Sequence, residues 1–176
     1  MIKSKSKRLL ICIVMTVILV MLDQLAKAWA VARLKDNSSI DIIKGALELY
    51  YLPNGNTGAA FGMLAGHQVL FMIIAIVICV VLFYIIYNMP FDKKYIILNI
   101  SMVLIISGGI GNMIDRIRLN YVVDFIYFSL INFPVFNVAD SYVSVGTVLL
   151  VVLLLFYYKE DDIKIIEDNI KIGLHK

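Results

Sequence analysis

Four long apolar stretches limit what this chain can fold into. They occupy residues 9–30, 69–87, 95–113 and 138–158, and most of their side chains are aliphatic or aromatic. A helix needs roughly 20 apolar residues to cross the hydrocarbon core of a bilayer, and each stretch is close to that length. The sequence therefore predicts a mainly α-helical membrane protein with four transmembrane helices.

The composition favours one integral membrane domain. Of the 176 residues, 61% are hydrophobic and only 16% are charged, so the chain is far more apolar than a soluble domain. We expect a single domain over residues 1–176. Basic residues before the first stretch are typical of a cleavable signal peptide, but the run continues through Asp23 and Lys27 to Trp29. This run is too long for a signal peptide, so we expect a retained first span.

The uneven distribution of basic residues predicts the orientation in the membrane. Lysines or arginines gather before the first span, at residues 93–94 between the second and third spans, and in the tail 159–176. The positive-inside rule places these segments, and hence both termini, in the cytoplasm. Loops 31–68 and 114–137 then face outward. Isoleucines at helical spacing predict a short surface helix in the tail.

The outward loops contain short runs that favour β-structure. Residues 40–43 and 47–52, followed by turn residues at 53–55, predict a hairpin, and residues 121–128 predict a third strand. A small sheet on the membrane surface would satisfy backbone groups that lipid cannot. The small and apolar residues 58–64 predict a short interfacial helix.

Two polar motifs on the outer side each allow two interpretations. Asp23 and Lys27, four residues apart, share one face of the first span. They form either a structural ion pair whose lysine extends to the membrane surface, or a charged pair that organises an outer pocket. Asn56 and Gly58 belong either to a plain turn or to a segment whose backbone approaches a substrate closely. In the second case Asn56 supplies both a donor and an acceptor.

The third span ends in a group of polar residues. Ser107 and Gly111 form a small-xxx-small face, which is typical of close helix packing. Asn112, Asp115 and Arg116 have no such packing role. We therefore expect them to form a polar network that supports a site.

Two acids, Asp124 and Asp140, lie at the outer membrane boundary. Each has a structural interpretation: Asp140 fits the N3 position of a helix capped by Asn137, and Asp124 fits a surface strand. Acids at a membrane boundary are nevertheless functional candidates, and only a loop separates these two. Two carboxylates that share a site do not both ionise readily, so one keeps a proton while the other activates water. The helix dipole favours ionised Asp140, which leaves the proton on Asp124.

Two other classes of function remain open at this point. A transporter or channel could use a set of charged residues as an ion path, namely Asp23, Lys27, Asp115 and Asp140. The second and fourth spans, however, are apolar at mid-depth. A metal-dependent membrane enzyme would need a ligand motif, but the chain has only His67 and His175 and its acids match no metal spacing. We expect no metal and no cofactor. The balanced charges of the outward loops predict no nucleic-acid partner.

In their order along the chain, these motifs resemble the bacterial lipoprotein signal peptidases, also called signal peptidase II. The resemblance rests on Asp23 with Lys27, on NTGAAF at 56–61, on GGIGNMIDR at 108–116, on VVDF at 122–125 and on FPVFNVADS at 133–141. It covers the chain from the first span to the fourth. At Gly55 the sequence departs from the family, whose members often have a basic residue there.

The resemblance implies an intramembrane aspartyl peptidase whose catalytic pair is Asp124 and Asp140. It further implies a set of residues that line or support the pocket: Asp23, Lys27, Asn56, Gly58, Asn112, Asp115, Arg116 and Asn137. The substrate implied is a diacylglyceryl-modified prolipoprotein, cut on the N-terminal side of its lipidated cysteine. We expect a monomer in the bacterial cytoplasmic membrane, in contact with membrane lipid, with its site at the outer face.

Overall fold

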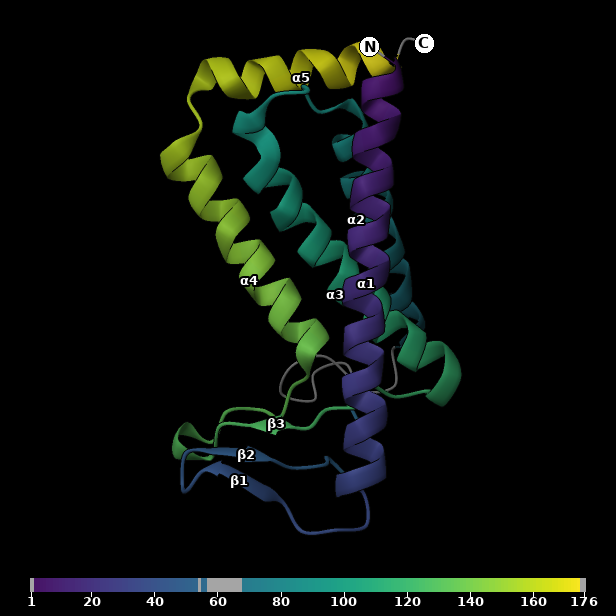
Figure 1. Ribbon diagram of the computed structural model, residues 1–176, viewed down its shortest axis with the longest axis vertical. Coiled ribbons are helices and arrows are strands. Elements are labelled where there is room, and N and C mark those ends of the chain that lie inside the picture. The colour runs from purple at the N-terminus through teal and green to yellow at the C-terminus, as the bar shows by residue number, and fades with distance from the viewer. Residues whose placement is uncertain (1, 54, 57–67, 175–176) are drawn as a thin grey trace.

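Four long helices form a bundle, with a small sheet at one end and both termini at the other (Figure 1). The computed structural model describes residues 2–53, 55–56 and 68–174. The helices are α1 (Ile2–Leu34), α2 (Gln68–Asn88), α3 (Ile96–Leu119) and α4 (Val138–Val152), and α4 continues in a π-helical turn (Leu153–Tyr157). Each of the four is long and apolar enough to cross a membrane, which confirms the predicted fold.

Helix α3 extends further than the apolar stretch that predicted it. The expected span ended at residue 113, whereas the helix runs to Leu119 and ends at Asn120, which has a left-handed φ of 62°. The first residues of the predicted loop 114–137 are therefore helical. An apolar run marks the part of a helix that lies in lipid, and polar residues continue the helix beyond it. Asn112, Asp115 and Arg116 consequently project from one rigid element.

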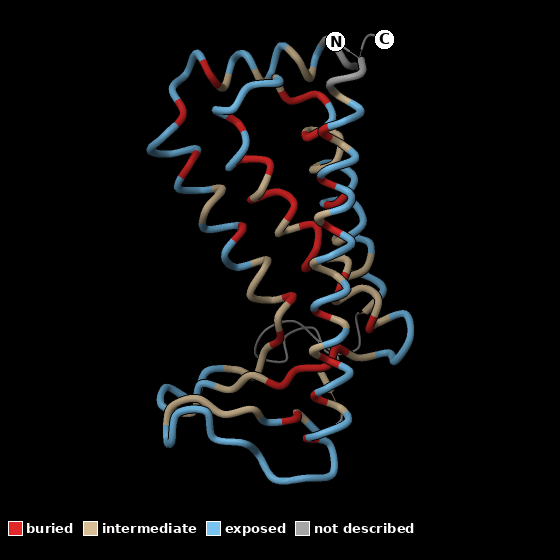
Figure 2. Tube along the Cα trace, in the orientation of Figure 1, coloured by how far each residue is buried: buried red, intermediate tan, exposed pale blue. Residues whose placement is uncertain are grey.

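Helix α3 is the centre of the bundle. In the most apolar 18-residue segment of α3, 50% of the residues are buried. The corresponding shares are 17% in α1, 11% in α2 and 17% in α4. Figure 2 shows the buried residues along α3. Small residues allow α4 to approach: a Cβ added at Gly108 would clash with the Ala139 carbonyl oxygen. At Gly111, a Cβ would lie 2.6 Å from Asp23 Oδ2 and 3.2 Å from Ala139 Cβ. The close packing predicted from Ser107 and Gly111 is present.

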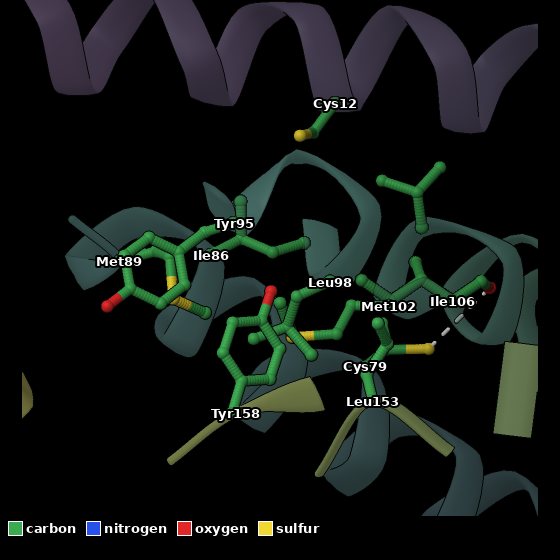
Figure 3. Close-up of a cluster of buried hydrophobic side chains, with 11 residues drawn as sticks. Cys12, Cys79, Ile86, Met89, Tyr95, Leu98, Met102, Ile106, Leu153 and Tyr158 are labelled. Carbon is green, nitrogen blue, oxygen red and sulfur yellow. Dashed lines mark hydrogen bonds between the residues drawn. The ribbon is translucent and has the colours of Figure 1, made fainter. Parts of the chain in front are cut away.

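A cluster of apolar side chains packs between the helices of the bundle (Figure 3). It includes Ile86, Met102 and Ile106, and the rings of Tyr95 and Tyr158 stack with centroids 5.5 Å apart. Both cysteines, Cys12 and Cys79, are buried and free, in agreement with a packing role.

The sheet at the opposite end has the order β1–β2–β3 and is antiparallel. Strand β1 (Ile40–Ile43) and strand β2 (Leu47–Leu49) form the predicted hairpin, with Gly45 at a φ of 72° in its turn. Strand β3 (Ile126–Tyr127) is much shorter than the predicted strand 121–128.

The missing part of the third strand forms irregular hydrogen bonds instead. The backbone N–H of Tyr50 donates to Phe125 O, that of Leu52 donates to Asp124 O, and Asn56 pairs with Val122. The Val123 N–H donates to the Asp115 side chain, 3.1 Å away, and cannot join a ladder. This irregular segment carries Asp124.

Helix α5 (Glu160–Leu174) crosses the end of the bundle that carries the termini (Figure 1). The ion pair between Lys94 and Asp162 (2.6 Å) and a bond from Tyr84 Oη to Ile170 O (3.3 Å) hold it there. This confirms the predicted helix in the tail. The interfacial helix predicted at residues 58–64 lies outside the described residues.

Candidate active site

Asp124 and Asp140 reach the site from different elements. Asp124 lies in the irregular segment before β3, and Asp140 lies in the first turn of α4. Asn137 caps α4: its Oδ1 accepts a hydrogen bond from Asp140 N (2.9 Å), and Asp140 Oδ2 accepts one from Asn137 N (3.1 Å). The predicted cap is therefore present. This reciprocal arrangement fixes the Asp140 carboxylate at the start of the helix.

Side-chain amides hold the remaining carboxylate oxygens. Asn137 Nδ2 donates to Asp124 Oδ1 (2.7 Å), and Asn56 Nδ2 donates to Asp124 Oδ2 (2.9 Å). Asn112 Nδ2 donates to Asp140 Oδ1 (2.7 Å). Every oxygen of the two acids thus accepts a bond from a neutral N–H group. Asn137 donates to both acids, so the structure brings the two together as the sequence predicted.

The two acids differ in their environment. Asp124 is 1% exposed, whereas Asp140 is half-buried. Burial, and next the negative charge of Asp140, raise the pKa of Asp124 to about 7, against the hydrogen bonds from Asn56 and Asn137. An acid with such a pKa exists in both protonation states near neutral pH, as a general acid or base must.

A buried group of charges lies next to the acids. Lys27 Nζ is 2.9 Å from Asp23 Oδ2 and 3.0 Å from Asp115 Oδ2, and it donates to Asn112 Oδ1 at 2.9 Å. Lys27 is 3% exposed and Asp23 is fully buried. The interpretation of this pair as one whose lysine extends to the membrane surface is therefore wrong. Two acids from different helices draw the ammonium group into the protein.

This charged triad, Asp23–Lys27–Asp115, also holds the backbone beside each candidate catalytic acid. Asp23 Oδ1 accepts a bond from Ala139 N (2.9 Å), the residue before Asp140. Asp115 Oδ2 accepts a bond from Val123 N (3.1 Å), the residue before Asp124. Each triad carboxylate thus fixes the residue that precedes one acid. Through these two bonds the triad helps to fix the spacing between Asp124 and Asp140.

Gln24 donates hydrogen bonds to both acids of the triad. It was not among the predicted site residues. Its Nε2 donates to Asp115 Oδ1 (3.0 Å), to Asp23 Oδ2 (3.2 Å) and to Gly111 O (3.2 Å). The sequence did contain a signal for Gln24, because it is a polar amide within an apolar span. Such residues usually form hydrogen bonds to a neighbouring helix.

Arg116 lies at the edge of the site. Its Nη1 donates to Asn112 O at 3.4 Å, and its guanidinium lies over the Phe71 ring, 5.4 Å from the centroid. Its positive charge also interacts with Asp140 and Asp124. Arg116 thus helps to hold the helix turn that presents Asn112, and it balances part of the negative charge.

The position that departs from the family pattern has a structural reason. Gly55 has a φ of 65°, and an added Cβ would overlap the Tyr121 ring. A basic side chain does not fit there without movement of Tyr121. Gly58, predicted to support the site, lies outside the described residues.

Metal ligands do not gather in the described part of the chain. No group of three or more histidine, cysteine, aspartate or glutamate side chains there is arranged to hold a metal ion. The acids described above are paired with amides and with a lysine instead.

Comparisons with known proteins place this site in a family. The model of the family described as signal peptidase (SPase) II matches residues 15–156. The lipoprotein signal peptidase of Clostridium tetani is 43% identical over 157 residues, which cover 87% of this chain and 97% of the relative. That of Streptococcus agalactiae serotype Ia is 44% identical over 145 residues, 82% of this chain and 91% of the relative.

A solved structure extends the likeness to the fold. It is described as a bacterial membrane enzyme at 2.3 Å resolution, and it superposes with a TM-score of 0.70 and 32% identity over 85% of this chain and 92% of that chain. The family match runs from within the first membrane-spanning helix to near the end of the fourth, and the relatives match over nearly their full lengths. This chain therefore belongs to the signal peptidase II family of lipoprotein signal peptidases.

Proposed function

We propose that this chain is an aspartic endopeptidase that removes the signal peptide from diacylglyceryl-modified prolipoproteins. It cuts on the N-terminal side of the lipidated cysteine, and Asp124 and Asp140 are its catalytic pair. The names of the relatives support the class of substrate. The arrangement of the two acids supports the chemistry.

One observation carries the proposal: Asn137 donates to both acids, from its side chain to Asp124 and from its backbone to Asp140. Among the described residues, each carboxylate oxygen accepts one side-chain or backbone N–H bond, and it has a second lone pair. A water molecule between the acids therefore finds acceptors on both sides. The neutral donors fix the acids without neutralising them.

In the proposed reaction, the oxygen of this water attacks the scissile carbonyl carbon as ionised Asp140 takes one of its protons. Neutral Asp124 donates a hydrogen bond to the carbonyl oxygen, where negative charge develops. The C–N bond then breaks, and the leaving nitrogen takes a proton from the acid pair. The lower exposure of Asp124, which is buried where Asp140 is half-buried, favours Asp124 as the neutral member. The N-terminus of α4 favours the ionised form of Asp140.

The membrane position suits a lipidated substrate. The first turn of α4, which carries Asp140, and the segment before β3, which carries Asp124, lie at the sheet end of the bundle (Figure 1). The positive-inside rule assigns this end to the outer face. A signal peptide that spans the bilayer reaches this depth from the side, and its acyl chains lie at the same surface. Each buried methylene contributes about 0.8 kcal/mol to binding. The lipid group of the substrate therefore increases its affinity for the enzyme, in addition to distinguishing it from other signal peptides.

A matched pair of substrates tests the proposal. Purified protein in lipid receives the same prolipoprotein with and without its diacylglyceryl group, and mass spectrometry locates the cut. We expect cleavage of the lipidated form only, with the modified cysteine as the new N-terminus and no loss of rate in a strong chelator. Equal cleavage of both forms would indicate a general signal peptidase. Loss of activity in the chelator that added metal restores would indicate a metalloenzyme.

A further inference from the structure

A cavity of about 530 Å3 lies at the end of the bundle opposite the acids. Its walls come from α1, from α3 and from the link between α2 and α3, and they are mainly apolar, with Ile11, Met15, Ile100 and Val103 among them. The volume falls within the range of about 300–1,000 Å3 that is typical of ligand sites. None of these residues takes part in the site described above.

The shape of this cavity suits a hydrocarbon chain that enters from the bilayer. Ile11, Phe91 and Ile96 line it and are 50%, 69% and 50% exposed, so the cavity is bordered by side chains that face lipid. From Ile96 to Val103 its wall extends roughly 10 Å along α3, at 1.5 Å per helical residue. It therefore begins near the membrane surface and continues into the hydrocarbon region.

Arg8 is the charged side chain buried in the wall of this cavity. It is 7% exposed, and its Nη1 and Nη2 donate to Pro90 O and Tyr87 O, both at 3.0 Å. Its Nε has no hydrogen-bond partner among the described residues. Asn99, 9% exposed, also lines the cavity: its Nδ2 donates to Tyr95 O, and its Oδ1 has no partner within the same residues. Buried polar atoms without partners are costly, which points to a ligand.

We propose that the cavity binds an anionic phospholipid of the cytoplasmic leaflet, with one acyl chain between α1 and α3 and the phosphate at Arg8. Lys93 lies at the rim and adds a second positive charge. Among the described residues, Asp92 is the one acid of the lining, and its Oδ1 accepts a bond from Lys94 N (2.8 Å). The charges of the lining are therefore positive on balance, which matches an anionic headgroup.

The same charges argue against the signal peptide of a substrate as the occupant. A signal peptide has a positively charged segment on its cytoplasmic side. Arg8 and Lys93 would repel this segment.

Fluorescence quenching by brominated lipids tests the proposal. The chain has one tryptophan, so Trp29→Phe with Phe91→Trp places a single probe at the cavity. Full-length protein is reconstituted in vesicles with brominated phosphatidylglycerol or brominated phosphatidylcholine. We expect phosphatidylglycerol to occupy the site with a preference of about fivefold, the size of one basic contact with an anionic lipid.

Matched variants separate this cavity from general surface charge. Arg8→Gln should abolish the preference, whereas Lys7→Gln, which removes an exposed charge next to it, should keep it. Ile100→Phe narrows the cavity and should weaken quenching, whereas Ile97→Phe on the lipid-facing side should not. Circular dichroism confirms that each variant is folded, and Ile100→Phe tests the proposal should Arg8→Gln fail to fold.

Four results would overturn the proposal. Equal quenching by the two lipids would remove the anionic preference, and equal effects of Arg8→Gln and Lys7→Gln would assign it to surface charge. Relief of quenching by inorganic phosphate would indicate a site for phosphate alone. Relief by excess signal peptide would make the substrate the occupant.

Discussion

Replacement of Asp124 by asparagine should abolish cleavage and remove a loss of stability that the parent protein undergoes as the pH rises. The amide is nearly isosteric, keeps the bond from Asn137 Nδ2 to its Oδ1 and cannot act as an acid or base near neutral pH. It loses the bond from Asn56 Nδ2, because an NH2 group replaces the Oδ2 that accepted that bond, and this cost is the same at every pH. A positioned acid or base contributes on the order of 100-fold to 10,000-fold to the rate. The parent protein loses stability as the pH rises because it must then bury a carboxylate at this position.

The size and sign of this effect follow from the pKa of Asp124. Burial raises it from 3.8 to about 7, and this difference corresponds to at most about 4 kcal/mol, at 1.36 kcal/mol per pKa unit. The folded protein holds the proton more tightly than the unfolded chain does. This contribution to stability is therefore complete below about pH 4 and is lost as the pH rises through about 7. Asp124→Asn has no such charge to bury and avoids that loss.

Thermal unfolding of parent and variant at pH 5 and pH 8 measures the difference. The stability of Asp124→Asn relative to the parent should be about 2–3 kcal/mol higher at pH 8 than at pH 5, which corresponds to a relative melting temperature higher by on the order of 5 °C. Asp41→Asn, which removes an exposed acid from β1, is the control and should show no such dependence. A stability difference between variant and parent that is the same at pH 5 and pH 8 would refute the reasoning.

Three further predictions concern the acid pair, the triad and the topology. The acids act as one unit, so Asp140→Asn should lose about as much activity as Asp124→Asn, and the double variant should lose no more than either. Additive losses in single-turnover assays would indicate independent roles. Lys27→Met leaves two buried carboxylates without their cation and should lower stability by about 3–5 kcal/mol, together with activity; a fully stable and active variant would remove the triad from the framework of the site. A cysteine at Ser39 should react with an impermeant thiol reagent in intact cells, and one at Asp161 should react only after permeabilisation; the reverse pattern would invert the orientation.

The sequence predicted the architecture because the thickness of the bilayer fixes the length of an apolar helix. The four spans, the helix after Lys159, the hairpin at 40–49 and the cap of α4 by Asn137 all follow from local patterns. Spacing along a helix also predicted that Asp23 and Lys27 pair. Such features depend on residues that are close in the chain.

Only the tertiary structure decided which partners the polar residues find. Lys27 is buried because Asp115 on another helix binds it, and no pattern within α1 contains this information. The same holds for Gln24, and for the bonds from Ala139 N and Val123 N to triad acids. These contacts depend on how closely the helices approach one another.

That approach depends on packing between distant segments. Glycines of α3 lie against Ala139 of α4, and this contact sets how near Asp140 comes to Asn112. Burial on all sides, which raises the pKa of Asp124, likewise exists only after the irregular segment before β3 has packed. The sequence by itself therefore determined which residues are candidates for the chemistry and predicted at which membrane depth they lie. The fold alone decided their distances, partners and protonation, because electrostatic and hydrogen-bond energies depend on positions in space rather than on order in the chain.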